Sequence, residues 1–325
     1  MSKSLNIAVI GAGAWGIGLA CTYSRIGNVT LWSRSEPGKL AETGRLPRLP
    51  EIKLPASINV TTTLPREADV AFLVVPTQAL RTISTTLNDI LPASVPVIAC
   101  CKGLEKDTAL FPLEIMEQTM PHHPKAVLSG PNFAIEVAEG LPTAATLAAS
   151  SRLFVQEAAR KLTTPNLRLY ASTDPIGVQL AGAAKNVIAI GAGITIGANL
   201  GENARAALIT RALAELGRLV EAMGGQSRTI YGLAGVGDLI LTCTGAGSRN
   251  YSLGVALGKG NSLSEILAQR STVAEGALSA ATICDLGPRY GVETPIMDAV
   301  YRLLKGELTP EQARDELLDR PSRLE

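Results

Sequence analysis

A glycine-rich turn near the start of the chain constrains its fold more than any other feature. Residues 6–10 (NIAVI) form a short apolar run typical of a buried strand, and the next six residues read GAGAWG. A helix pattern follows over residues 17–26, and a second apolar run over residues 29–32. A GxGxxG pattern between a strand and a helix, within one βαβ unit, is the fingerprint of a dinucleotide-binding Rossmann fold. A glycine-rich turn without a ligand is the alternative that this context disfavours.

The three glycines of the pattern have separate expected roles. Gly11 allows the tight turn, Gly13 lets a pyrophosphate approach the backbone, and Gly16 lets helix and strand pack closely. The N-terminus of the following helix supplies unpaired N–H groups and partial positive charge. We therefore expect a dinucleotide at this turn.

The end of the second strand bears on the choice of dinucleotide. An acidic residue there holds the ribose hydroxyls of NAD, whereas an arginine suits the 2′-phosphate of NADP. The run ends in LWSRS, so Arg34 could hold the phosphate through charge-assisted hydrogen bonds. Glu36 is the competing residue, but it comes past the strand, in a turn before Pro37. The pattern favours NADPH and leaves NADH possible.

The rest of the first half alternates between strand and helix patterns, as a doubly wound sheet requires. Residues 37–66 are rich in proline and basic residues without clear periodicity, so we expect an irregular excursion with one short helix at most. Further strands are expected over residues 69–75, 95–100, 126–128, 143–149 and 167–171, and helices over residues 77–91, 133–139 and 153–162.

Three of these strand ends carry residues suited to a ligand. Ligands bind beyond the carboxyl ends of strands in open parallel sheets, which places Pro76, Lys102 and Gly130 near the expected nicotinamide end. Lys102 is either functional or an ordinary surface lysine. Asn132 can cap the helix over residues 133–139, whose first N–H groups could also face an anion.

A long apolar segment opens the second half, where the patterns become helical. Residues 178–200 are apolar or small at almost every position, as in a helix buried on all sides. The segment is long enough to be mistaken for a membrane span, but we expect no span. Asp174 and Pro175 look like the cap and first residue of this helix. We expect an NAD(P)-binding α/β domain over residues 1–174 and a helical substrate-binding domain over residues 175–325.

Lys185 lies inside this apolar helix, beside Asn186. Burial disfavours the charged form of a lysine, so the side chain reaches the surface, pairs with a carboxylate or exchanges protons in a reaction. Hydride transfer requires an accompanying proton transfer. The chain has two histidines, His122 and His123, and we expect both in a proline-bounded surface turn. Lys185 is therefore the better acid–base candidate.

A second polar group follows in the helical half. Asp238 and Thr242 are four residues apart and so share one helix face, although Asp238 could be only an N-cap. Ser248, Arg249 and Asn250 follow a glycine-rich turn, and arginine and asparagine at a helix start suit a phosphate group. An exposed arginine without a ligand is the alternative.

Composition excludes several classes of protein. The net charge of +1 does not indicate nucleic-acid binding, and 46% hydrophobic residues indicate a compact globular chain. Five cysteines without a CxxC pair, and an N-terminus without a signal-peptide pattern, are typical of a cytoplasmic protein with reduced thiols. The ligand spacings do not predict a metal site.

Seven motifs occur in one order along the chain, namely GAGAWG, CKGLE, SGPNFA, AAKNVIAI, GVGDLILTC, SRNY and VAEG. With them the chain resembles the bacterial-type NAD(P)-dependent glycerol-3-phosphate dehydrogenases over nearly its whole length. The resemblance implies a Rossmann domain followed by an all-α domain like that of 6-phosphogluconate dehydrogenase. It also implies reversible reduction of dihydroxyacetone phosphate to sn-glycerol 3-phosphate, the first backbone step of glycerophospholipid synthesis. We further expect a homodimer through the helical domain.

The resemblance also implies roles for single residues. Lys185 matches the proton-transferring lysine of the family, and the expected catalytic group is Lys185, Lys102, Asn186, Asp238 and Thr242. The glycine pattern, the strand ends and the resemblance together give as cofactor contacts Gly11, Gly13, Ala14, Trp15, Gly16, Arg34, Pro76, Lys102, Ala134, Arg249, Val273 and Glu275. The implied substrate contacts are Lys102, Gly130, Asn132, Lys185, Asp238, Ser248, Arg249 and Asn250.

Two positions depart from the family pattern. Family members usually have Ser or Thr where Asn132 stands and Lys where Ile135 stands, although Asn132 can still form hydrogen bonds. Two other interpretations remain open. A ketopantoate reductase or 3-hydroxyacid dehydrogenase would share the layout but take a carboxylate substrate. A sensing module would bind NADPH without turnover.

Overall fold

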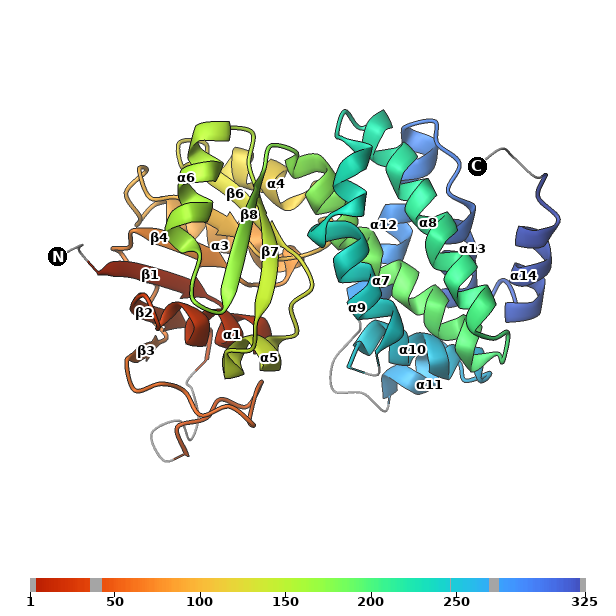
Figure 1. The fold of residues 1–325 in the computed structure, drawn as a ribbon, viewed down its shortest axis with the longest axis horizontal. Coiled ribbons are helices and arrows are strands. Elements are labelled where there is room, and N and C mark those ends of the chain that lie inside the picture. Colours follow the sequence, from red (N-terminus) through yellow and green to blue (C-terminus); the bar gives the residue numbers. More distant parts are fainter. Residues whose placement is uncertain (1–3, 36–42, 246, 269–274, 322–325) are drawn as a thin grey trace. The chain divides into compact units, whose positions relative to one another are not determined.

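The computed structural model describes residues 4–35, 43–245, 247–268 and 275–321, apart from the side chains of residues 275 and 278. The chain divides into two compact units, Met1–Pro175 and Ile176–Glu325 (Figure 1). This division falls one residue beyond the boundary expected from the sequence. Unit 1 is α/β and unit 2 is helical in its described residues, so the predicted fold class is confirmed.

The strands of unit 1 form one sheet in the order β3-β2-β1-β4-β5-β6-β7-β8. Neighbouring strands are parallel except β6 and β7, which are antiparallel. The strands are β1 (Leu5–Ile10), β2 (Gly27–Trp32), β3 (Ile58–Thr61), β4 (Val70–Leu73), β5 (Val97–Ala99), β6 (Lys125–Ser129), β7 (Thr143–Ala148) and β8 (Leu167–Ser172).

Strand β3 lies within the segment for which we expected no strand. It has four residues, of which Ile58 is buried, and it pairs in parallel with β2 at the edge of the sheet. An edge strand this short has little room for an alternating apolar pattern. The expectation of an irregular excursion over residues 37–66 was therefore wrong at β3.

Helices cover both faces of the sheet, as doubly wound folds require. Along β1, Ile7 and Val9 join one apolar cluster while Ala8 and Ile10 join another. The first cluster includes side chains of α1 (Ala14–Tyr23), α5 (Ala134–Glu139) and α6 (Arg152–Leu162). The second includes side chains of α3 (Thr77–Asn88) and α4 (Pro112–Thr119), a helix absent from our expectations. Because both faces of β1 are buried over residues 7–10, these four residues are all apolar.

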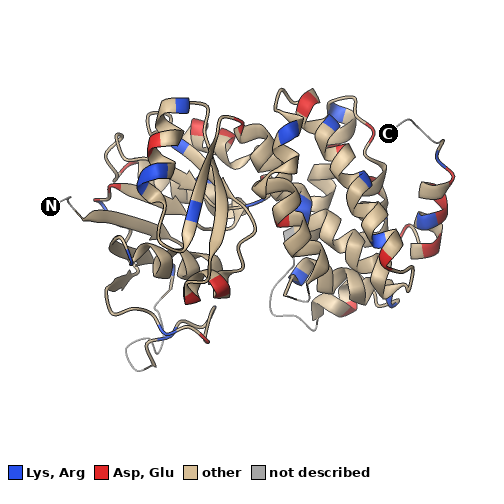
Figure 2. Ribbon diagram, in the orientation of Figure 1, with Lys and Arg blue, Asp and Glu red and all other residues tan. Residues whose placement is uncertain are grey.

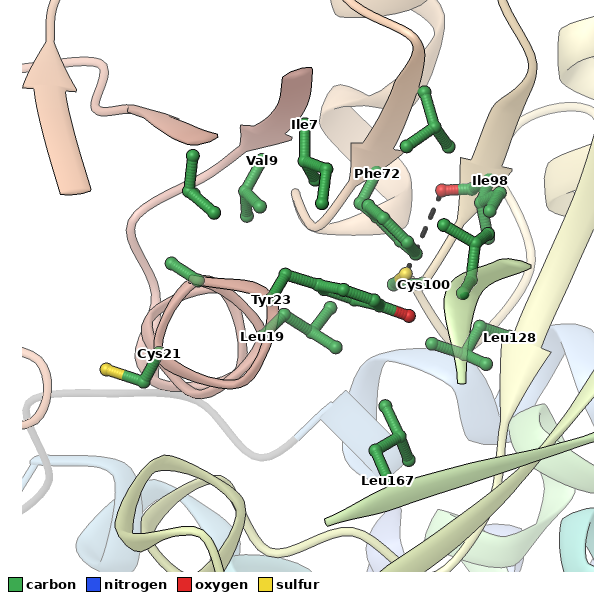
Figure 3. Close-up of a cluster of buried hydrophobic side chains, with 14 of the residues drawn as sticks. Ile7, Val9, Leu19, Cys21, Tyr23, Phe72, Ile98, Cys100, Leu128 and Leu167 are labelled. Atoms are coloured by element: carbon green, nitrogen blue, oxygen red, sulfur yellow. Dashed lines mark hydrogen bonds between the residues drawn. The ribbon is translucent and has the colours of Figure 1, made fainter. Parts of the chain in front are cut away.

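Aromatic stacking marks the centre of the first cluster. The rings of Tyr23 and Phe72 stack with centroids 4.6 Å apart, among Ile7, Val9 and Leu19 (Figure 3). The hydroxyl oxygen of Tyr23 is buried and has no hydrogen-bond partner among the described residues. Burial therefore raises the pKa of Tyr23 well above its usual value.

Unit 2 is organised around helix α7 (Pro175–Gly197). The helix has the length and hydropathy of a membrane span, but 89% of its most apolar window is buried within the structure, as expected of a core helix. It begins at Pro175, where the sequence predicted its first residue. The helices that follow are α8 (Glu202–Ala222), α9 (Asp238–Thr244), α10 (Arg249–Gly258), α11 (Leu263–Ala268), α12 (Glu275–Arg289), α13 (Pro295–Leu304) and α14 (Pro310–Leu318).

Helices α7 and α10 pack backbone against backbone. A Cβ atom at Gly254 would lie 2.0 Å from the carbonyl oxygen of Ile190, so a larger residue would force the helices apart. This contact brings the start of α10 close to the middle of α7. Helix α14, near the C-terminus, carries acidic and basic residues along its length (Figure 2).

Candidate active site

The glycine turn of unit 1 has the backbone shape that its sequence predicts. Gly11 has φ of +122°, and a Cβ there would lie 2.5 Å from the carbonyl oxygen of Val74. A Cβ at Gly16 would lie 1.8 Å from the carbonyl oxygen of Gly11, so α1 packs closely on β1. A Cβ at Gly13, by contrast, would have no atom within 4 Å. The space beside Gly13 is therefore open to a ligand.

Helix α1 begins directly beyond this open space. Gly13 is its N-cap residue and supplies no side-chain hydrogen bond, and Ala14 and Trp15 form the partly exposed start of the first turn. The N–H groups of an uncapped first turn are suited to an anion such as a pyrophosphate. These residues fit a dinucleotide.

Arg34 follows β2 and is exposed. The neighbouring Ser33 is held to β3, because its N–H donates to the carbonyl oxygen of Thr61 at 2.8 Å. Glu36, the competing residue, lies outside the described residues. Arg34 is thus positioned at the carboxyl end of β2, where the sequence placed it.

Pro76, Lys102 and Gly130 lie beyond the ends of β4, β5 and β6, which are neighbours in the sheet. The structure therefore brings these strand ends to one edge. Lys102 is half-buried, and its carbonyl oxygen accepts a hydrogen bond from the Thr77 hydroxyl at 3.2 Å. Gly130 packs against β7, since a Cβ there would lie 2.9 Å from the Cα of Ala145.

Asn132 does not cap the helix that follows it, so that expectation was wrong. Helix α5 starts at Ala134 with Phe133 as N-cap residue and no side-chain cap. The Asn132 amide instead donates to the Thr143 hydroxyl at 2.6 Å and to the Ala144 carbonyl oxygen at 3.1 Å, both on β7. The sequence around Asn132 did not predict these hydrogen bonds, because their acceptors lie on β7, 11 and 12 residues further along the chain.

The structure pairs Lys185 with Asp238, which is 53 residues away in the chain. The Lys185 Nζ atom forms an ion pair with the Asp238 carboxylate and donates a hydrogen bond to Thr242 Oγ1 at 3.2 Å. The side chain of Asp238 is 1% exposed and that of Lys185 is 12% exposed. The ammonium group is therefore held by two partners while part of the lysine remains accessible.

Helix α9 presents both partners of the lysine on one face, as the four-residue spacing predicted. Asp238 lies in its first turn, after a stretch of π-helix over Leu233–Gly237, and Gly237 is the N-cap residue. The alternative role of Asp238 as the N-cap was therefore wrong. The Thr242 hydroxyl bonds back to the carbonyl oxygen of Asp238 at 2.5 Å, which fixes its orientation.

Asn186 and Asn250 form a second polar contact beside the first. The Asn250 amide donates to Asn186 Oδ1 at 2.9 Å, and Asn250 Oδ1 accepts the N–H of Gly276 at 3.0 Å. Three helices, α7, α10 and α12, are joined at this point. The Ser248 hydroxyl caps α10 by accepting the N–H of Tyr251 at 3.2 Å, and Arg249 is exposed in the first turn.

Three residues named in the sequence analysis remain, namely Val273, Glu275 and His123. Val273 lies outside the described residues, and of Glu275 only the backbone, at the start of α12, is described. The expected surface position is wrong for His123, because its ring is buried, with Nδ1 2.9 Å from the carbonyl oxygen of Val95, near the amino ends of β5 and β6. The described residues contain no group of three or more His, Cys, Asp or Glu that could hold a metal.

Cys243 is a residue near the cluster that the sequence did not single out. It is buried next to Thr242, and burial raises the pKa of its thiol to about 12, with Lys185 acting in the opposite direction. The thiol therefore stays protonated near neutral pH and is a poor nucleophile.

Comparison with known proteins adds independent findings. The family model for the N-terminus of NAD-dependent glycerol-3-phosphate dehydrogenase matches residues 6–155, and the model for the C-terminus matches residues 174–315. The chain is 58% identical over 322 residues to a glycerol-3-phosphate dehydrogenase (NAD(P)+) of Gluconobacter oxydans, covering 99% of each chain. It is 44% identical to a protein of the same name from Rhodospirillum rubrum, covering 98% of this chain and 94% of the other. A crystal structure of glycerol-3-phosphate dehydrogenase from Coxiella burnetii superposes with a TM-score of 0.90 and 37% identity, covering 98% of this chain and 99% of the other.

Proposed function

Because the chain belongs to the NAD-dependent glycerol-3-phosphate dehydrogenase family, we propose that it is a sn-glycerol-3-phosphate dehydrogenase. It would reversibly reduce dihydroxyacetone phosphate to sn-glycerol 3-phosphate with a nicotinamide cofactor. The observation that carries the proposal is the contact of Lys185 with Asp238 and Thr242. These two residues hold the Lys185 ammonium group, which is partly accessible and can donate a proton.

The proposed chemistry needs one hydride and one proton. A bound nicotinamide supplies the hydride, which goes to the carbonyl carbon of the substrate. The Lys185 ammonium group gives its proton to the carbonyl oxygen, so that an alcohol forms and the lysine becomes a neutral amine. Asp238 then favours return of a proton from solvent, because an adjacent carboxylate stabilises the ammonium form. Thr242 restrains the direction of the Nζ atom.

The phosphate end of the substrate is assigned to the start of α10. Arg249 is exposed there, and arginine binds phosphate through paired N–H groups. Asn250 and the first-turn N–H groups of α10 add neutral donors. The Ser248 hydroxyl already accepts a backbone N–H, but its proton remains available for a phosphate oxygen. In unit 1, Lys102, Gly130 and Asn132 are the proposed substrate contacts.

The proposed cofactor site is the open space beside Gly13, with Ala14, Trp15, Pro76, Lys102 and Ala134 as further contacts. Arg249, Val273 and Glu275 are proposed contacts from unit 2. We propose NADPH as the preferred cofactor, because Arg34 is exposed at the end of β2 and can pair with a 2′-phosphate.

The setting of the enzyme is also a proposal. None of the five cysteines, all of which the structure describes, forms a disulfide, which supports a reducing compartment such as the cytoplasm. The product would enter glycerophospholipid synthesis, and the active form would be a homodimer.

The experiment that tests the function follows NADPH absorbance with three substrates. Rapid oxidation with dihydroxyacetone phosphate, and almost none with unphosphorylated dihydroxyacetone, would support both the substrate and the phosphate site. Turnover of ketopantoate or another ketoacid instead would favour a carboxylate-specific reductase. Tight NADPH binding without turnover of any ketone would favour a sensing module. Replacing NADPH by NADH in the same assay tests the cofactor preference.

A further inference from the structure

The loop between β5 and α4 carries Lys102 and is fastened to helix α3. Thr77 and Gln78 stand at the start of α3, and Arg81 follows one turn later. The Gln78 amide nitrogen donates to the carbonyl oxygen of Leu104 at 2.9 Å, and its oxygen accepts the N–H of Lys106 at 3.1 Å. One side chain thus gives the loop backbone both a donor and an acceptor, as a neighbouring strand would.

Arg81 and Glu105 form a second connection between the same two elements. Arg81 Nε and Nη2 donate to Glu105 Oε1 and Oε2 at 2.9 and 2.8 Å, so the pair is bidentate. Arg81 Nη1 also donates to Gln118 Oε1 on α4 at 2.9 Å. The Glu105 side chain is 12% exposed, and Arg81 holds the pKa of this carboxyl below its usual value. The ion pair therefore belongs to a network that ties α3, the loop and α4 together.

The loop itself has a backbone that needs outside support. Gly103, next to Lys102, has φ of +117°, and Ala109 has φ of 57°, which is unfavourable for a residue with a side chain. The side chain of Leu104 is 1% exposed and anchors the loop in the core. Between Gly103 and Ala109, the contacts from Gln78 and Arg81 reach residues 104–106 directly. They therefore act on the backbone that places Lys102.

We propose that Gln78, Arg81 and Glu105 are positioning residues that hold Lys102 in its binding conformation. The proposal rests on the proposed function, in which Lys102 contacts cofactor and substrate. The three side chains act through the loop, whereas Lys102 itself supplies the charge. Glu105 lies within the CKGLE motif, in which Lys102 is the predicted site residue.

A double-mutant cycle between the ion pair and the lysine tests the proposal. We expect Lys102→Ala to lower kcat/KM for dihydroxyacetone phosphate about 100-fold, since hydrogen bonds to charged groups are strong. Arg81→Ala should lower it about tenfold, chiefly by raising KM, and Glu105→Ala should act similarly. In the Lys102→Ala background, Arg81→Ala should have no further effect. Effects that multiply would show a general structural role and overturn the proposal.

The matched control is another bidentate pair, Arg302 with Glu316, whose atoms lie 2.7 and 3.2 Å apart in unit 2. Arg302→Ala should leave kcat and KM unchanged. If Arg81→Ala does not fold, Gln78→Met removes both amide hydrogen bonds at similar size and should raise KM about fivefold.

Hydrogen exchange of the loop provides a readout that does not depend on turnover. Amides of residues 100–110 should exchange faster in the Arg81→Ala and Gln78→Met variants than in the unmodified chain. Unchanged exchange would overturn the proposal, as would a Lys102→Ala variant with normal kinetics. Turnover of dihydroxyacetone phosphate by the unmodified chain shows separately whether the proposed function stands.

Discussion

The two units hold their candidate site residues in different ways. In unit 1 the site is built from backbone at strand ends, and side chains such as that of Arg34 extend into solvent. In unit 2 the site is built from side chains that hold one another, as Asp238 holds Lys185 and Asn250 holds Asn186. The first arrangement follows from short sequence patterns. The second exists only when distant helices have packed.

This difference predicts where substitutions cause most damage. In unit 2, replacing one member of a buried pair leaves the other unpaired in a region of low dielectric constant, which is costly. In unit 1, replacing an exposed side chain removes one contact to a ligand and little else. Substitutions and a pH change in both units test this contrast.

The largest effect is expected for Lys185→Met. Loss of the proton donor should lower kcat by about 10³-fold, within the range for general acid catalysis. NADPH affinity should remain almost unchanged, because the glycine turn in unit 1 is untouched. Steady-state kinetics and a fluorescence titration with NADPH measure the two quantities. Weak NADPH binding by this variant would assign Lys185 a structural role instead.

The second prediction concerns another buried carboxylate of unit 2. Glu215 is 2% exposed and accepts N–H groups of Ile296 and Met297 at the start of α13, at 2.8 and 3.4 Å. Burial raises its pKa to about 7, while these hydrogen bonds and the charges of Arg218 and Arg320 act in the opposite direction. Unlike Asp238, this carboxylate has mainly backbone donors.

The raised pKa of Glu215 sets the sign of a pH dependence. Because the folded chain binds this proton more tightly than the unfolded chain, stability should fall as pH rises from 5 towards 8. The expected loss is about 2 to 3 kcal/mol, because the pH rises about two units from 5 to the folded pKa of about 7, at about 1.36 kcal/mol per unit. Urea unfolding at both pH values should show this loss in the unmodified chain and a smaller one in Glu215→Gln. Glu221→Gln, an exposed change on the same helix, is the control, and equal pH dependence in all three chains would contradict the assignment.

The third prediction returns to an exposed residue of unit 1. Arg34→Ala should lower kcat/KM for NADPH about tenfold and leave the value for NADH nearly unchanged, because one charge-assisted contact is lost. Thermal stability should not change. The ratio of the two kcat/KM values is the measurement. A preference for NADPH that survives the substitution would show that the end of β2 does not select the cofactor.

The smallest effect is expected in the core of unit 1. Tyr23→Phe removes a buried hydroxyl that has no partner among the described residues, so it should stabilise the protein by about 1 kcal/mol. Urea unfolding measures the change. Tyr170→Phe is the matched control, because Tyr170 is 49% exposed and its hydroxyl is already hydrated. A clear loss of stability in Tyr23→Phe alone would mean that the hydroxyl has a partner, such as buried water.

Much of unit 1 was predictable because its signals are local. The glycine turn, the apolar strands and the carboxyl-edge positions of Pro76, Lys102 and Gly130 follow from spacing within a few residues. Prediction failed where pairing is distant or the pattern is short. Strand β3 has four residues at a sheet edge, and the Asn132 amide bonds to β7 rather than to its own helix.

The sequence alone was enough to predict most strands and helices of unit 1, the dinucleotide turn and a lysine inside an apolar helix. Local backbone preference and apolar periodicity encode these features, so they can be read without knowing which segments meet. The family resemblance grouped Asp238 and Thr242 with that lysine, but their contacts with it required the tertiary structure. The contacts of Gln78 and Arg81 with the loop of Lys102 had no counterpart in the sequence patterns. Such partners are 24 to 57 residues apart in the chain, and the packing of whole helices brings them together.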